Sequence, residues 1–168
     1  MSQTTTLARP TPVSGARAAG AVAAVAGLGV VLGVLWWWLA PMARAQVQGG
    51  QVLLAGHQEL QVAQDGWFAV VTAVCGIAAA ALVSARPGRR AALLGPLVAV
   101  VVSVVAWRTG VLLGPPSVQD QVSAGVLDPL TPLQLHAYGV LLVGPFLFTV
   151  TQFLAALFSR PDDGSSLD

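Results

Sequence analysis

The charged residues of the chain are separated by four long stretches that contain none. These stretches cover residues 18–43, 66–85, 91–107 and 129–159, and each is rich in Val, Leu, Ala and Gly. A transmembrane helix needs about 20 mainly apolar residues to cross roughly 30 Å of hydrocarbon. The pattern therefore predicts four helices, at about 18–41, 67–84, 92–113 and 135–158. The polar ends, residues 1–17 and 159–168, are expected to be flexible tails.

The composition indicates that these helices lie in a membrane rather than in the core of a soluble protein. Of the 168 residues, 55% are hydrophobic and 9% are charged, and the mean hydropathy is +0.75. Soluble domains carry about 25% charged residues, so four buried soluble helices would leave too little polar surface to dissolve the chain. We therefore expect an all-α membrane protein, in which residues 18–158 form one four-transmembrane-helix bundle.

The arginines predict the orientation, because short cytoplasmic loops retain Lys and Arg near helix ends. Six of the eight basic residues lie at one side of the predicted bundle: Arg9, Arg17, Arg86, Arg89, Arg90 and Arg160. Both termini are thus expected in the cytoplasm, with the loops at 42–66 and 114–134 outside the cytoplasmic membrane. In the first loop, residues 51–54 and 59–62 partly alternate around Gly56, which is the pattern of a short extracytoplasmic β-hairpin.

The tryptophans are expected to anchor the outer ends of the helices. Trp36, Trp37 and Trp38 end the first helix, Trp67 begins the second, and Trp107 is near the outer end of the third. Indole rings favour the headgroup boundary, so the five should form one belt. Residues 43–45 resemble a signal-peptidase site, but the apolar stretch before them is longer than a signal core, and we expect an uncleaved helix.

Four residues form a candidate polar site at the outer face: Arg108, Asp65, His136 and Trp67. An arginine about one turn inside a transmembrane helix is costly unless it snorkels, pairs or faces a polar cavity. Asp65 is expected at the same depth as a partner, and His136 could join them. One interpretation is a pocket that holds an anionic headgroup or substrate; the other, which we favour, is a snorkelling arginine or an ion pair that fixes two helices.

Other chemistry finds little support in the sequence. The formal net charge is only +1 and the arginines are scattered, which argues against nucleic-acid binding. The chain has a single cysteine, Cys75, which excludes an internal disulfide. A metal centre usually has three or four ligands, so His57 and Glu59 could form one only if His136 completed the ligand set. Without a nucleophile elbow or phosphate-binding loop, we expect no catalytic residue, no metal and no cofactor.

Small residues indicate how the helices pack. Gly29 and Gly33 form a Gly-x-x-x-Gly pattern that lets two backbones approach, within one bundle or between two copies. The two halves also share a weak similarity, in which 60–62 precedes Gly66 as 133–135 precedes Gly139, an offset of 73. A parallel repeat about the membrane normal is therefore a hypothesis.

Three motifs, at residues 106–115 (Ala-Trp-Arg-Thr-Gly-Val-Leu-Leu-Gly-Pro), 35–41 and 65–68, carry a resemblance. The chain resembles an actinobacterial family of small four-helix membrane proteins known only as a domain of unknown function, some of whose members are loosely labelled permeases. The resemblance covers about residues 20–158 and implies no substrate and no catalytic residues. It departs at Gly144-Pro145, where the family pattern has Trp-Pro.

Two functions follow as expectations. The leading one is a small accessory or interaction subunit in the cytoplasmic membrane, because the middle of every predicted helix lacks ionisable residues. Its partners would be the lipid bilayer and another membrane protein, or further copies of the chain. The alternative is a transporter component for a small or lipid-like solute, for which Pro96 and Gly144-Pro145 could break helices and expose backbone carbonyls.

Overall fold

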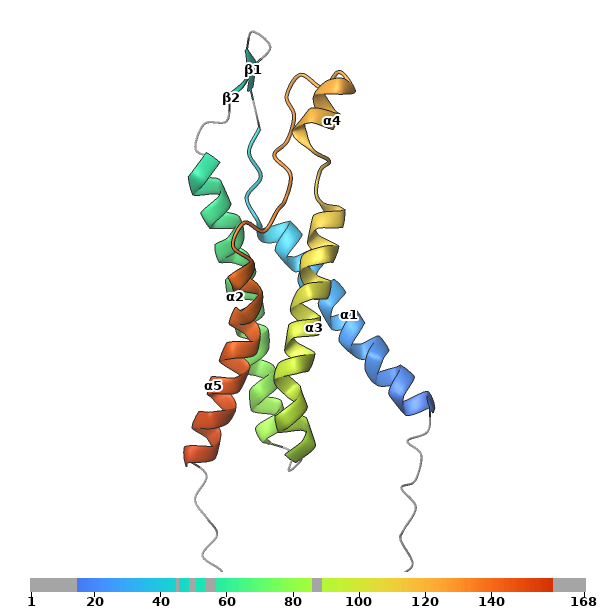
Figure 1. Ribbon diagram of the computed structural model, residues 1–168, viewed down its shortest axis with the longest axis vertical. Coiled ribbons are helices and arrows are strands. Elements are labelled where there is room, and N and C mark those ends of the chain that lie inside the picture. Colours follow the sequence, from blue (N-terminus) through green and yellow to red (C-terminus); the bar gives the residue numbers. More distant parts are fainter. Residues whose placement is uncertain (1–14, 45, 49–50, 54–56, 86–88, 159–168) are drawn as a thin grey trace, which may run out of the picture.

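The computed structural model describes residues 15–44, 46–48, 51–53, 57–85 and 89–158. In chain order the elements are α1 (Gly15–Leu39), β1 (Gln46–Gln48), β2 (Gln51–Leu53), α2 (His57–Ser84), α3 (Arg89–Leu113), α4 (Val118–Ser123), the 3₁₀ helix η1 (Tyr138–Leu142) and α5 (Val143–Phe158). Four of these helical segments are long and apolar enough to cross a membrane. The predicted four-helix transmembrane architecture is confirmed, and α4, β1 and β2 lie together at one end of it (Figure 1).

Two helix boundaries differ from the prediction. The second helix begins at His57 rather than near 67, so α2 is 28 residues long and extends beyond the apolar stretch. The fourth begins later than predicted, because residues 135–137 are not helical and residues 138–142 form η1. Pro145 is the third residue of α5, where the missing N–H costs nothing because the first-turn amides have no partner within a helix.

The hairpin forms from other residues than those predicted. β1 and β2 are antiparallel, with Val47 opposite Val52, and the chain between them reads Gly49-Gly50, a dipeptide typical of tight hairpin turns. The prediction that 59–62 forms the second strand is wrong, since these residues lie in α2. Glu59 in the first turn of α2 favours this outcome, because a carboxylate there interacts well with the helix dipole.

Helices that run in the same direction make the largest contacts. α1 packs mainly against α3, and α2 packs mainly against α5. Gly29 and Gly33 lie at the α1–α3 crossing: a Cβ on Gly29 would be 2.6 Å from Val105 Cβ, and one on Gly33 would be 2.5 Å from the Ala106 carbonyl oxygen. Both glycines therefore serve packing within the bundle, where a side chain would force the two helices apart. Below this crossing α1 diverges from the other helices (Figure 1).

The core is concentrated at the upper half of the bundle in Figure 1. Trp36 and Phe68 are both fully buried, and their rings meet edge to face at 5.0 Å between centroids. The tryptophan-belt prediction is thus only partly right, because Trp36 is a core residue while Trp38 is 75% exposed. Successive residues on a helix point about 100° apart, so three consecutive tryptophans cannot all face lipid.

Candidate functional site

The candidate site is centred on two consecutive residues of α2, Gln64 and Asp65. Both are buried although they are polar, and they lie just above the buried aromatic pair of the core. A buried polar group is costly unless it is hydrogen-bonded. Their partners therefore decide what the site does.

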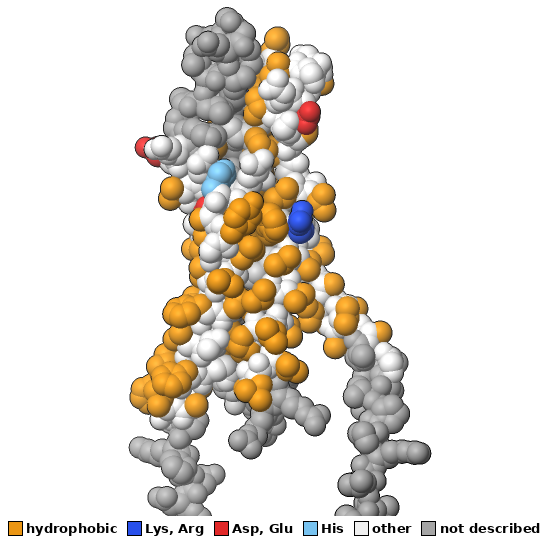
Figure 2. Space-filling view, in the orientation of Figure 1, with side chains coloured by type: hydrophobic (Ala, Val, Ile, Leu, Met, Phe, Trp, Pro, Cys, Tyr) orange, Lys and Arg blue, Asp and Glu red, His pale blue; other side chains and the backbone are white. Residues whose placement is uncertain are grey.

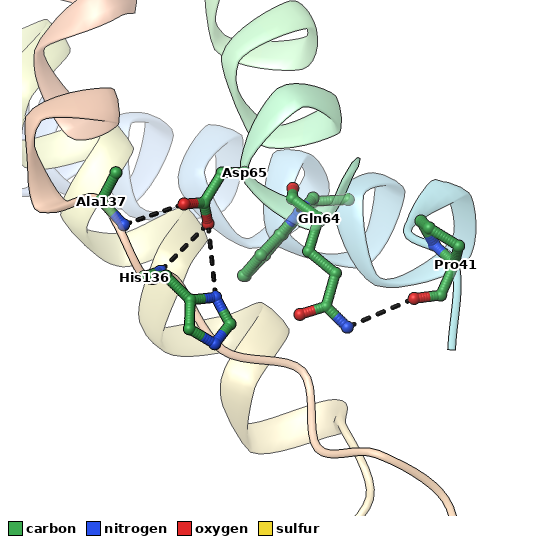
Figure 3. A network of polar contacts seen from close by, with 6 residues as sticks. Pro41, Gln64, Asp65, His136 and Ala137 are labelled. Carbon is green, nitrogen blue, oxygen red and sulfur yellow. Dashed lines mark hydrogen bonds and ion pairs between the residues drawn. The ribbon is translucent and has the colours of Figure 1, made fainter. Parts of the chain in front are cut away.

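Gln64 joins α2 to the end of α1. Its backbone carbonyl accepts a hydrogen bond of 2.9 Å from the indole Nε1 of Trp36, and its side-chain amide donates one of 3.2 Å to the carbonyl of Pro41 (Figure 3). The Trp36 indole also covers Gly110 of α3, where a Cβ would approach the ring to 2.3 Å. The buried Trp36 side chain of α1 thus contacts both α2 and α3, and it fixes the positions of these three helices relative to one another.

Asp65 joins α2 to the segment that precedes η1. Its two carboxylate oxygens accept backbone N–H bonds from His136, at 3.0 Å, and from Ala137, at 2.8 Å (Figure 3). The His136 ring nitrogen Nδ1 is 3.8 Å from Asp65 Oδ1, which is an ion-pair distance for a protonated ring but too long for a hydrogen bond. Two charge-assisted bonds to backbone amides make this carboxylate a latch, which we call the Asp65 latch.

The structure brings only two of the four predicted site residues together. Asp65 pairs with His136, and no ion pair forms between the described residues Asp65 and Arg108. Of the two structural alternatives, the snorkelling arginine therefore fits better than the ion pair. Arg108 is exposed and places its guanidinium carbon 4.6 Å from the ring centroid of Trp107. A guanidinium that lies on an indole and extends toward the interface needs no carboxylate partner. Trp67 is 41% exposed, as an anchoring ring would be.

The 3₁₀ helix continues this aromatic surface. Tyr138 of η1 meets the ring of Trp107 edge to face, with 5.7 Å between centroids. Tyr138, Trp107 and Arg108 form a stack, by which we mean this edge-to-face ring contact together with the guanidinium on the Trp107 ring. Tyr138 directly follows Ala137, which bonds to Asp65. Tyr138 is 64% exposed, so the stack is a surface feature and encloses no pocket.

Hydrogen bonds also organise the end of the bundle that the arginine pattern predicts to lie outside. We call this region the outer cap and define it as residues 40–44, the β1–β2 hairpin and residues 114–137. The Gln121 side chain donates to the carbonyls of Pro116, at 2.7 Å, and Leu130, at 2.8 Å, and accepts from the Leu130 N–H at 2.9 Å. Thr131 N–H donates to the Ala43 carbonyl at 2.9 Å, which ties the second outer loop to the first. Uncharged Gln and Thr side chains gave no signal in the sequence, because such residues are common in loops.

The chemistry available to this site is limited. The described residues hold no cluster of three or more His, Cys, Asp or Glu side chains that could bind a metal ion. Each carboxylate oxygen of Asp65 accepts one backbone hydrogen bond, which fixes the orientation of this side chain. The hydrogen bonds in Figure 3 join α2 to Pro41, after the end of α1, and to residues 136–137, before η1.

Comparison of the chain with protein-family models, with curated proteins and with solved structures finds no match. The resemblance to the actinobacterial four-helix family stays a prediction that rests on the three motifs. Gln64 and Asp65 thus join α2 to the end of α1 and to the segment before η1.

Proposed function

We propose that this chain is a small accessory subunit of the cytoplasmic membrane, with both termini in the cytoplasm, and that its outer cap binds another membrane protein. The supporting observation is that the cap is held by the Gln121 and Thr131 hydrogen bonds and yet presents apolar side chains. Leu127 is 84% exposed, and Val122 and Val126 beside the same turn are also exposed. Apolar residues grouped on an ordered, otherwise polar cap are typical of an interaction surface.

The rest of the molecule supports a binding role. Figure 2 shows hydrophobic side chains over the visible face of the bundle, with few charged groups among them. The polar side chains that the structure does bury, such as Gln64 and Asp65, are engaged within the chain. A subunit of this kind contributes shape and contacts to an assembly, and the chemistry is performed by its partner.

A photoreactive amino acid tests this proposal in native membranes. Placed at Leu127, it should give one reproducible adduct with another membrane protein after illumination. Leu112 supplies the matched control, because it is equally exposed but lies on the apolar surface of α3, where lipid adducts are expected. Adducts with lipid or with further copies of the chain at both positions would refute the accessory role, and Leu127→Asp should abolish the Leu127-dependent complex.

A second function, as a carrier component for a lipid-like solute, is favoured by one observation. A cavity of about 270 Å³ lies among the four spanning helices, and its walls are almost wholly apolar. Uptake of a fluorescent lipid by proteoliposomes that contain only this chain would support a carrier. Uptake equal to that of protein-free liposomes would refute it.

A further inference from the structure

The apolar cavity is built from all four spanning helices. α1, α2, α3 and α5 all contribute to its wall, which includes Leu32, Cys75, Ala79, Ala99, Val102 and Phe148. The Phe148 ring covers Gly95 of α3, where a Cβ would approach the ring to 2.2 Å. Thr72 and Ser103 also line the cavity, but polar atoms contribute very little to its wall, which is therefore almost wholly hydrocarbon.

The lining residues of α1 and α3 are buried toward one end of the cavity and more exposed toward the other, which we take as its opening. Along α3 the exposed fraction of its lining residues rises from 6% at Val102 to 41% at Val98 and 56% at Leu94. Along α1 it rises from 8% at Leu32 to 42% at Leu28. Both trends run toward the end of the molecule where α1 begins, which is the end where α1 diverges in Figure 1.

The position of the opening determines what can fill it. Leu28, Leu94 and Val98 lie within segments that are apolar enough to span a bilayer, so hydrocarbon chains surround the opening. Water gains nothing in such a cavity, because a buried water molecule needs two to four polar partners. An apolar cavity of about 150 Å³ already accommodates benzene, so this cavity has room for a longer hydrocarbon.

Other occupants fit less well. A helix with its side chains is about 10–12 Å in diameter, which is too wide for a cavity of this size. The terminal segments 1–14 and 159–168 are rich in Ser, Thr, Pro and Asp, and an apolar wall offers no partner for those side chains. A saturated chain is narrow, flexible and already present at high concentration around the opening.

We propose that this cavity binds one acyl chain of a membrane phospholipid. The chain inserts beside α1 from the end where that helix begins, and its tip reaches the level of Val102. The headgroup stays at the interface of the same leaflet. This inference is independent of the accessory role, because its test measures occupancy of the cavity and neither partner binding nor transport.

Photolabelling tests it directly. The full chain is reconstituted in phosphatidylcholine–phosphatidylglycerol liposomes that contain a small fraction of phospholipid with a diazirine midway along one acyl chain. After illumination, peptide mass spectrometry should place adducts on the cavity-lining residues Cys75, Ala79, Val98, Ala99 and Val102, at a higher yield than on the exposed residues Phe153 and Phe158. Equal yields on all lipid-facing surfaces would overturn the proposal.

Filled variants provide the second measurement. Ala79→Phe and Ala99→Phe each place a ring in the cavity from a different helix, so cavity labelling should be lost. The matched controls, Ala78→Phe and Val101→Phe, add the same ring at exposed neighbouring positions outside the cavity wall and should leave labelling unchanged. Unchanged labelling in a folded filled variant would overturn the proposal. If neither filled variant folds, the wild-type adduct map decides it alone.

Discussion

The Asp65 latch makes a quantitative prediction about the stability of the bundle. A hydrogen bond to a charged group is worth about 1.5–3 kcal/mol, and Asp65 accepts two from backbone amides while it is 9% exposed. In Asp65→Asn one oxygen still accepts, but the new amide group faces an N–H donor. We therefore expect a loss of about 1.5–3 kcal/mol for Asp65→Asn and about 3–5 kcal/mol for Asp65→Ala, where both bonds are removed.

The assay is equilibrium unfolding in mixed micelles with increasing SDS mole fraction, followed by tryptophan fluorescence. Glu59→Gln is the matched control, because Glu59 is an exposed carboxylate on the same helix, and its loss should stay within about 0.5 kcal/mol. Amide exchange localises the effect: protection at His136 and Ala137 should fall in Asp65→Asn and be unchanged in Glu59→Gln.

One result would refute this reasoning. If Asp65→Asn is neutral or more stable than the wild type, or if protection at His136 and Ala137 is unchanged, the carboxylate is not a latch. A stabilising substitution would instead assign Asp65 to ligand binding, since functional groups often persist at a cost to stability.

Three further predictions concern packing and the outer cap. Gly33→Leu should destabilise the protein by about 1–3 kcal/mol, the usual cost of overpacking, because a Cβ there would be 2.5 Å from a backbone oxygen. Gly27→Leu is the control: a Cβ at Gly27 has no atom within 4 Å, so this variant should be neutral in the same SDS titration. Trp36→Phe should cost about 1–3 kcal/mol, because the indole N–H bond to the Gln64 carbonyl and part of the buried ring volume are lost. Trp38→Phe at an exposed position should change stability by less than about 0.5 kcal/mol. Gln121→Leu removes three hydrogen bonds of the cap and should speed proteolysis of residues 114–137 while leaving the SDS midpoint of the bundle unchanged.

Hydropathy predicts the part of a helix that lies in lipid, and it fails where a helix continues into water. The uncharged stretches gave the spans of α1 and α3 within a few residues. α2 begins ten residues before its predicted start, because residues 57–66 are polar enough to be solvated and still form regular helical turns. The opposite error occurred at residues 135–142, which are mostly apolar but precede Pro145 and are held by Asp65 in a non-α conformation.

The candidate site was only partly accessible from the sequence for a related reason. Asp65 and His136 could be recognised as ionisable residues near the outer boundary, and the structure does bring them together. The sequence left open whether Arg108 snorkels or pairs with Asp65, because it gives the depth of a residue in the membrane but not the direction in which it points. In the structure these two residues form no ion pair. The burial of Trp36 depends on the rotation of α1 about its axis, which is set by the small residue Gly110 on another helix.

The packing of the helices is relevant both to the proposed internal repeat and to the position of the cavity. The offset of 74 that relates Pro41 to Pro115 also relates Trp36 to Gly110, and these two residues are in contact. Asp65 bonds residues 71 and 72 positions away, so the like-directed helices pack nearly in register, as two halves related about the membrane normal would. One difference between the halves concerns packing: α3 packs more extensively against α5 than α1 does against α2. The cavity opens beside α1, where the first half lacks the packing present in the second, and a bound acyl chain would supply the missing apolar contact.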